Sequence, residues 1–364
     1  MKPIGLYLHI PFCRSKCDYC DFYSLAGRDD LFEKYTQRII ASIRSWGEKL
    51  GRSADTLYFG GGTPSLLSPD QIGEIIKSAR ESFSLTDAEI TLECNPSTVY
   101  DGFFDRIAEH GVNRISLGLQ SASAEERRAL GRKATPEQAA YAVRSAQRSG
   151  ISNISLDLML ALPHQTRDSL ARSVSLCAEL EAKHISAYIL KAEEGTPFAS
   201  RRNEHPDDDF AADMYLAACE MLGESEYKQY EISNFCKDGF ESRHNLKYWL
   251  CEEYLGIGPA AHSFLNGERI CYERDINAFL SGAEPGFDST GGDFEEFCML
   301  RLRLAEGLKG ADTQRLFGHS IPQDMIRRAR ALEKHSLTIC TDDSIRLTRQ
   351  GFLLSNAVIS EILG

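Results

Sequence analysis

Three cysteines near the start of the chain have the type and spacing of ligands for an iron–sulfur centre. Cys13, Cys17 and Cys20 follow the pattern C-x3-C-x2-C, and a proline stands just before this loop. Thiolates this close together can converge on one small inorganic centre. A [4Fe–4S] cluster held by only three of them keeps one iron open for a substrate or cofactor. A zinc site would need a fourth ligand, and no cysteine or histidine follows at zinc-ligand spacing.

The composition is that of a large acidic chain with unpaired thiols. The 364 residues are 42% hydrophobic, which is enough for a large core and a smaller domain. The cysteines number eleven, and those outside the loop lack the spacing of a disulfide framework. With no signal peptide before the loop and no apolar run of membrane-spanning length, we expect a soluble cytoplasmic protein. The net charge of −12 disfavours a nucleic-acid partner.

Strands and helices alternate up to about residue 223. The pattern predicts strands at 4–10, 56–59, 89–94, 114–120, 154–159 and 184–190. Helices are expected at 30–46, from 69 onward, before 110, and at 167–180 and 207–222. This order predicts an α/β fold of parallel βαβ units, a partial (β/α)6 TIM-like barrel. A doubly wound open sheet is the alternative.

The regular alternation of predicted strands and helices ends after residue 223. Residues 224–290 are rich in Gly, Tyr, Asn and Cys, have weak periodicity and are interpreted as an irregular extension. Residues 291–364 predict three helices, a short hairpin and a closing helix, an α+β order that resembles a winged helix. Because the chain is acidic, we expect this domain to bind protein or cover the barrel rather than bind DNA. The predicted division is therefore 1–223, 224–290 and 291–364.

Polar residues are expected at the carboxyl ends of the barrel strands, where such folds place their function. Glycines 60–62 let the backbone approach a ligand closely, although the run is neither a Walker loop nor GxGxxG. A ligand that chelates the open iron needs an amine and a carboxylate. Glycine carbonyls or Glu93 suit the amine, Arg132 suits the carboxylate, and Asp157 suits ribose hydroxyls. Each carboxylate could instead be a helix cap or part of a salt bridge.

The loop and several other motifs resemble the radical SAM superfamily, in its branch of oxygen-independent coproporphyrinogen oxidases. The motifs are YLHIPFC, GGGTPS, LECNP, LGLQS, LGR, DLMLALPHQT and EEGTPF, spread over nearly the whole chain. The resemblance implies that Cys13, Cys17 and Cys20 hold a [4Fe–4S] cluster whose open iron is chelated by S-adenosylmethionine (SAM). It places SAM contacts at Tyr7, Tyr19, Phe22, Gly61, Gly62, Thr63, Glu93, Gln120, Arg132 and Asp157.

Two departures separate the chain from the decarboxylases of this branch. The decarboxylases carry a fourth cysteine where this chain has Phe22, and they carry an N-terminal extension where only six residues precede Tyr7. A third feature, the motif HNxxYW at 244–249, is typical of the branch's heme chaperones. The resemblance therefore favours a protein that binds heme and delivers it to an apoprotein, for example in respiration, with SAM as a regulator or cleaved slowly. No catalytic residue is assigned.

Other functions stay open at this point. The second reading is a coproporphyrinogen III oxidase that decarboxylates propionates through a 5′-deoxyadenosyl radical. A third, a radical SAM enzyme acting on RNA, is disfavoured by the charge. A monomer and a dimer are both compatible with the sequence, as is peripheral contact with a membrane.

The heme motif offers one ligand and an aromatic surface. His244 is a plausible axial ligand as a neutral imidazole, and His262 is a second candidate. His244 could instead only form hydrogen bonds within a Tyr-rich segment. We expect packing or turn roles for His9 and His164. The motif residues assigned to heme are His244, Asn245, Tyr248 and Trp249.

Overall fold

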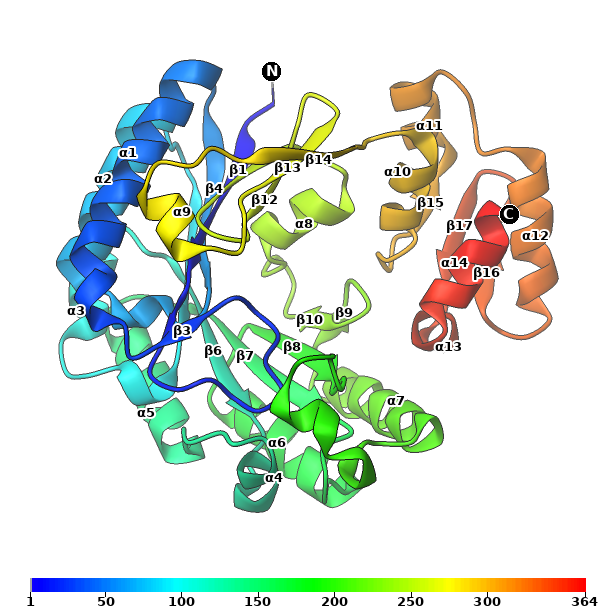
Figure 1. Ribbon diagram of the computed structural model, residues 1–364. Coiled ribbons are helices and arrows are strands. Elements are labelled where there is room, and N and C mark those ends of the chain that lie inside the picture. The colour runs from blue at the N-terminus through cyan, green and yellow to red at the C-terminus, as the bar shows by residue number, and fades with distance from the viewer. Residues whose placement is uncertain (1) are drawn as a thin grey trace.

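The computed structural model describes residues 2–364 and is organised around one 12-stranded sheet (Figure 1). Six parallel strands follow one another in chain order, so the predicted partial barrel is confirmed. A doubly wound sheet would instead reverse its strand order at a switch point. The strands are β1 (Ile4–Ile10), β4 (Ala54–Gly61), β5 (Glu89–Cys94), β6 (Arg114–Gln120), β7 (Asn153–Leu160) and β8 (His184–Ile189).

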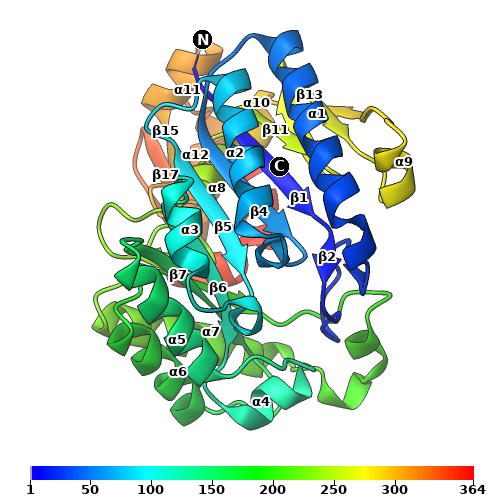
Figure 2. The ribbon, with the colours of Figure 1, turned by 90° about the vertical axis from the view of Figure 1, so that its left-hand side faces the viewer.

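Helices cover the outer face of this sheet, as Figure 2 shows for α1, α2, α3, α5 and α6. Capping boxes begin α2 at Ser68, α5 at Thr135 and α6 at Thr166. The first predicted helix continues four residues further, until Gly51 takes a left-handed conformation. The helices are α1 (Phe32–Leu50), α2 (Pro69–Phe83), α3 (Phe103–Glu109), α4 (Ala124–Ala129), α5 (Pro136–Arg148), α6 (Arg167–Glu179) and α7 (Asp208–Glu224).

The barrel interior is polar because successive residues of each strand face opposite sides. On β1, Leu6 and Leu8 belong to the hydrophobic core, whereas the alternating Tyr7 contributes a hydroxyl that bonds His9. Side chains on neighbouring strands also meet across the interior, such as Ser155 and His184, whose Oγ and Nδ1 lie 2.7 Å apart. The strands thus bury apolar residues under the helices and direct polar residues into the barrel.

Residues 224–290 complete both edges of the sheet. β11 pairs with β1 in parallel, β12–β14 continue antiparallel beyond it, and β10 and β9 extend the other edge beyond β8. The segment is more regular than its sequence indicated, because strands of two to five residues are too short to show periodicity. Its elements are β9 (Lys228–Gln229), β10 (Asn234–Cys236), α8 (Arg243–Trp249), β11 (Tyr254–Ile257), β12 (His262–Leu265), β13 (Glu268–Cys271), α9 (Ile276–Leu280) and β14 (Gly286–Thr290).

The C-terminal part forms helices around a three-stranded sheet in the order β15-β17-β16, as expected for a winged-helix-like domain. Figure 1 places it beside the barrel, on the side of α8. The three-way division stays a prediction, and its residue 1 lies outside the described residues. The elements are α10 (Phe294–Arg301), β15 (Leu308–Lys309), α11 (Gly310–Phe317), α12 (Gln323–Glu333), β16 (Thr338–Cys340), β17 (Ser344–Leu347), α13 (Arg349–Leu353) and α14 (Ser355–Leu363).

None of the helices within residues 2–364 combines the length and apolar composition that a membrane crossing requires.

Candidate functional site

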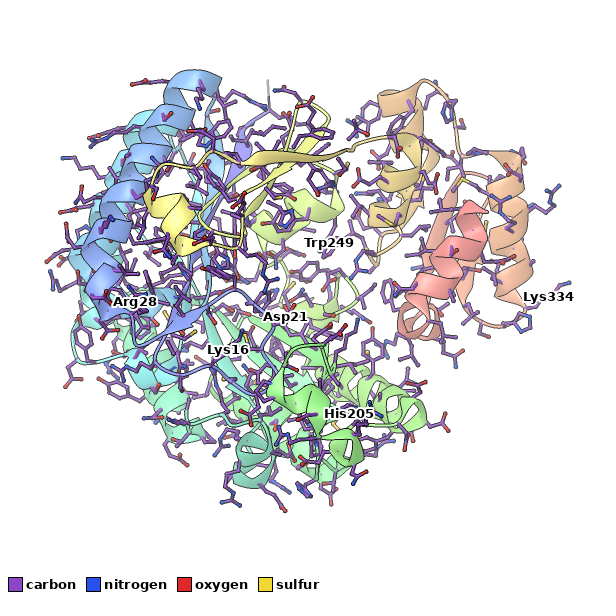
Figure 3. The ribbon with its side chains drawn as sticks, in the orientation of Figure 1. Lys16, Asp21, Arg28, His205, Trp249 and Lys334 are labelled. Atoms are coloured by element: carbon purple, nitrogen blue, oxygen red, sulfur yellow. The ribbon has the colours of Figure 1, made fainter. Side chains whose placement is uncertain are left out.

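The cysteine loop leaves the carboxyl end of β1 and lies over the mouth of the barrel. Short strands β2 (Phe12–Cys13) and β3 (Leu25–Ala26) pair in parallel at its two ends. Within the loop, the backbone of Asp18 bonds Leu130 and Phe198, with N–O distances of 3.3 and 2.9 Å. Figure 3 shows Lys16 and Asp21 of this loop near the centre of the mouth. Cys13, Cys17 and Cys20 all line one cavity of about 590 Å³ beneath the loop.

The surroundings of the three thiols fit an iron–sulfur cluster better than a single metal ion. Thr63 Oγ1 donates to Cys13 Sγ over 3.6 Å, and Arg132 Nη1 donates to Cys17 Sγ over 3.7 Å. Donors of this kind stabilise thiolates bound to a cluster. Across the part of the chain that the structure describes, no three His, Cys, Asp or Glu side chains converge closely enough for one ion. A cubane cluster binds its thiolates through different irons, so its ligands can stand further apart.

The glycine run is held against the start of the cysteine loop. The amides of Gly62 and Thr63 donate to the carbonyls of Ile10 and Phe12 at 2.8 and 2.7 Å. Gly61 has a φ of 110°, and a Cβ there would lie 2.8 Å from the ring of His9. This ring is itself fixed by Tyr23, whose carbonyl oxygen lies 2.8 Å from Nε2. Only glycine fits between this ring and the cavity.

Replacing Gly61 with alanine should therefore destabilise the protein by about 2–5 kcal/mol, because backbone strain and overpacking add. Gly195→Ala is the matched control, since Gly195 also has a positive φ (83°) but its Cβ would meet nothing within 4 Å. We expect the control to lose only about 1 kcal/mol. Urea unfolding followed by circular dichroism measures both, and equal losses would contradict the packing argument.

Two carboxylates line the cavity, Glu93 from β5 and Asp157 from β7, with β6 between these strands. Glu93 accepts hydrogen bonds from Tyr58 Oη at 2.8 Å and from the Gly61 amide at 3.2 Å. Burial raises its pKa to about 7, with Asp157 adding to the rise while these two bonds and Arg114 oppose it. Burial also raises the pKa of Asp157, opposed by hydrogen bonds from Ser186 and Ser116 and by the charges of Arg114 and Arg132. Glu93 is therefore poised between its neutral and ionised forms near pH 7.

A buried arginine inside the barrel faces these carboxylates. Arg114 on β6 is only 2% exposed, and its Nε has no hydrogen-bond partner among the described residues. No carboxylate in that same set lies within ion-pair distance of it, yet its charge lowers the pKa of both Glu93 and Asp157. We infer that Arg114 favours the ionised forms of both groups from below the cavity. Sequence reasoning missed Arg114 and Tyr58, although both lie at inward positions of strands that it predicted.

The end of β6 is distorted where it reaches the cavity. Gln120 has a φ of 66°, and the register between β6 and β7 shifts from Gly118 to Gln120. A non-glycine residue in this conformation costs on the order of 1–3 kcal/mol and is typical of functional sites. The distortion accommodates Arg132, whose Nη2 donates to the Gly118 carbonyl at 3.0 Å. A Cβ on Gly118 would lie 2.4 Å from that nitrogen.

The cavity brings together every predicted SAM residue except Tyr7. The ring of Tyr7 lies behind the glycine run, where a Cβ on Gly60 would be 2.9 Å away. Phe22 stands at the mouth with 68% of its surface exposed. The predicted residues that line the cavity are Cys13, Cys17, Tyr19, Cys20, Phe22, Gly61, Gly62, Thr63, Glu93, Gln120, Arg132 and Asp157.

The residues assigned to heme lie elsewhere, on α8 near the amino ends of the strands. His244 is 1% exposed, and its Nδ1 and Nε2 lie 2.8 Å from Thr56 Oγ1 and Tyr248 Oη. Burial lowers its pKa to about 3, so the imidazole is neutral, and both ring nitrogens are already hydrogen-bonded. The amide of Asn245 donates to the N-cap Ser242 at 3.4 Å.

Trp249, the last residue of α8, faces the C-terminal part. Its ring packs under the guanidinium of Arg303, with 4.5 Å between Cζ and the ring centroid. Figure 3 shows Trp249 at the boundary between the barrel and this part. His262, the second candidate, is exposed at the start of β12. The heme motif therefore lines neither the cysteine cavity nor the mouth.

Comparison with known proteins identifies relatives along the whole chain. The radical SAM superfamily model matches residues 7–177, and the HemN C-terminal domain model matches residues 293–354. Proteins named heme chaperone HemW are 35% identical in Escherichia coli strain K12 and 34% identical in Mycobacterium tuberculosis strain H37Rv. Each alignment spans 100% of this chain, and they cover 99% and 95% of the two relatives.

A solved structure supports the fold over the same length. It is described as coproporphyrinogen III oxidase (HemN) from Escherichia coli, a radical SAM enzyme. It superimposes with a TM-score of 0.85 at 21% identity, covering 99% of this chain and 90% of that one. The barrel and the C-terminal part are thus shared with that enzyme. With full-length identity above 30% to several of its members, the chain belongs to the HemW heme chaperone family of the radical SAM superfamily.

Proposed function

We propose that this chain is a heme chaperone, which binds heme and hands it to heme-accepting apoproteins. The observation that carries the proposal is the 34–35% identity, over the full length, to proteins named for this function. Phe22 agrees with it, since the decarboxylases have a cysteine at the corresponding position. Membership of the superfamily supports an iron–sulfur cluster and SAM as cofactors.

The cavity residues divide between these two cofactors. We assign the cluster to Cys13, Cys17 and Cys20, where its open iron would bind the amine and carboxylate of SAM. Glu93 and the glycine carbonyls would hold the amine, and Arg132 the carboxylate. Arg132 also donates to Cys17 Sγ, so one guanidinium would touch both cofactors. We assign the ribose hydroxyls to Asp157, and the rest of SAM to Tyr19, Phe22, Gly61, Gly62, Thr63 and Gln120. Tyr7, which lies behind the glycine run, would support that run instead of lining the cavity.

Heme is assigned to the motif on α8, under one structural condition. His244 Nε2 is engaged by the Tyr248 hydroxyl, so ligation of iron requires that this hydrogen bond is released. Tyr248 and Trp249 would then be available to cover a porphyrin face. Release costs about 1 kcal/mol for the bond itself, and because His244 is 1% exposed, ligation also requires that the packing over the imidazole opens.

A heme titration of the cluster-loaded protein tests this proposal. The wild type should develop a shifted Soret band, His244→Ala should bind heme at least about tenfold more weakly, and His262→Ala should bind like the wild type. Thermal unfolding of each variant separates lost ligation from lost folding, because His244 is buried and His262 is not. If only His262→Ala loses heme binding, the axial ligand is His262 and not His244.

The same preparation distinguishes a chaperone from an enzyme. Supplied with coproporphyrinogen III, SAM and a reductant under anaerobic conditions, it should form no protoporphyrinogen IX at a catalytic rate. Rapid formation of that product, or the absence of any heme binding by the wild type, would overturn the chaperone assignment.

We also propose a cytoplasmic location and a monomer or dimer as the working state. All eleven cysteines have free thiols in the structure, which suits a reducing compartment.

A further inference from the structure

A second, smaller cavity of about 280 Å³ lies on the other side of the cysteine loop. It shares Ser15, Cys17, Thr63, Asn95 and Arg132 with the larger cavity and has its own lining otherwise. Four segments contribute this separate lining: the cysteine loop, the turn that follows β5, the connection between α4 and α5, and the start of α5. Their principal side chains are Arg14, Ser97, Thr98, Lys133 and Gln138.

Every charged side chain that lines this cavity is cationic, although the whole chain has a net charge of −12. These are Arg14, Arg132 and Lys133, and within residues 2–364 none of them forms an ion pair. Three cations without a carboxylate partner around one hollow repel one another and create a positive local potential, which the Cys17 sulfur offsets only at Arg132. An anion is the occupant that relieves this repulsion.

Two of the three cations are held in place before any ligand arrives. Arg14 Nη1 donates to the carbonyl of Ser97 at 2.9 Å, and Arg132 Nη2 donates to that of Gly118 at 3.0 Å. Arg132 Nε is buried and has no hydrogen-bond partner in the described chain. The Gln138 carbonyl accepts from the Thr135 amide, so its NH₂ group is the part able to donate to a ligand.

We propose that this cavity binds the phosphate group of a small phosphorylated molecule. A phosphate dianion presents several acceptor oxygens to the three cations and needs no acidic residue nearby. Thr63, which is 7% exposed, and Cys17 line the cavity, so a ligand must enter to touch them. This requirement favours a small molecule over the flat acidic surface of a protein.

The bound anion also acts on the cluster, a consequence that rests on the proposed cluster at the three cysteines. Arg132 Nη1 donates to Cys17 Sγ over 3.7 Å. Hydrogen bonds and positive charge next to a cluster sulfur raise the reduction potential of the cluster. An anion that binds Arg132 from the smaller cavity offsets this charge, so its binding makes the cluster harder to reduce.

Phosphate binding to the cluster-loaded protein tests the inference. Inorganic phosphate is titrated by calorimetry into the wild type, Arg14→Gln and Lys133→Gln. Both variants should bind at least about tenfold more weakly, because each loses a charge-assisted bond. Lys334→Gln is the matched control, an exposed lysine far away in the C-terminal part (Figure 3), and should bind like the wild type. A redox titration should show a more negative cluster potential with phosphate in the wild type and no change in Arg14→Gln.

The outcomes separate this inference from the proposed function. A protein that loads its cluster and binds heme but not phosphate overturns the cavity assignment alone. Equal phosphate binding by all variants means that the anion binds elsewhere, and tighter binding of malonate than of phosphate means that the ligand is a carboxylate. If no cluster forms, the proposed function fails, while the calorimetric comparison still tests the cavity.

Discussion

Changing Cys17 to serine should abolish the iron–sulfur absorbance of the anaerobically reconstituted protein. With Cys17 lost, only two of the three loop thiols remain, and two thiolates cannot hold a cluster that already lacks a fourth protein ligand. Arg132 would also lose the sulfur to which it donates. We expect iron and sulfide contents near zero and no charge-transfer band, measured by absorption spectroscopy and iron analysis.

Cys271→Ser is the control for that experiment. Cys271 is a half-buried free thiol on β13, outside both cavities, so its loss should leave the cluster content unchanged. A Cys17→Ser variant with a full cluster would show that another residue supplies the ligand. A Cys271→Ser variant that lacks the cluster would show that the cluster is not bound at the cysteine loop.

Replacing Arg114 with methionine should weaken SAM binding at pH 7, by at most about fivefold for the first unit by which the pKa of Glu93 rises. In the wild type the raised pKa of Glu93, about 7, makes affinity increase from pH 6 to pH 8, as the carboxylate that receives the amine ionises. Without the arginine charge this pKa rises further, and each unit of rise above 7 lowers the ionised fraction at pH 7 by about five- to tenfold. The midpoint of the affinity–pH curve should therefore move upward, as equilibrium dialysis against labelled SAM would show.

Protein stability should respond to pH in a related way. A carboxyl whose pKa is higher in the folded state than its usual 4.5 holds its proton more tightly when folded. Its contribution is most favourable below pH 4.5 and is lost as the pH rises towards 7. In Arg114→Met this loss should continue to higher pH.

Two further variants provide the controls for Arg114→Met. Arg114→Lys, which keeps a charge, should retain most of the wild-type midpoint, whereas Glu93→Gln should flatten the curve. An unchanged midpoint in Arg114→Met would show that the two carboxylates are ionised without it.

The sequence predicted the site at the mouth better than the interior beneath it. Cys13, Cys17, Cys20 and the glycine run could be found because their types and spacing carry the chemistry, and the strand pattern placed Glu93 and Asp157 on one rim. Arg114 could not be assigned in this way. It opens a strand, where an arginine is usually exposed, and only the barrel geometry shows that its side chain points inward.

The HNxxYW motif shows a second limit of sequence reasoning. Its residues were expected to form a heme surface, but their partners come from segments that no local pattern connects to them. Thr56, which contacts His244, is 188 residues away in the chain. The strands of residues 224–290 were missed for a related reason, since each is defined by its pairing with a neighbour rather than by its own composition.

Helix α8 connects the proposed heme ligand His244 to the C-terminal part of the chain. Its seven residues make about two turns, with His244 near one end and Trp249 at the other. A rigid movement of this helix would therefore move both side chains together. Thr56 contacts the helix at His244, on the barrel side, and Arg303 contacts it at Trp249, on the side of the C-terminal part. If binding of a protein to the C-terminal part and binding of heme iron to His244 both shift α8, each ligand changes the affinity for the other by the same factor. Heme loading and heme release would then both depend on the position of α8.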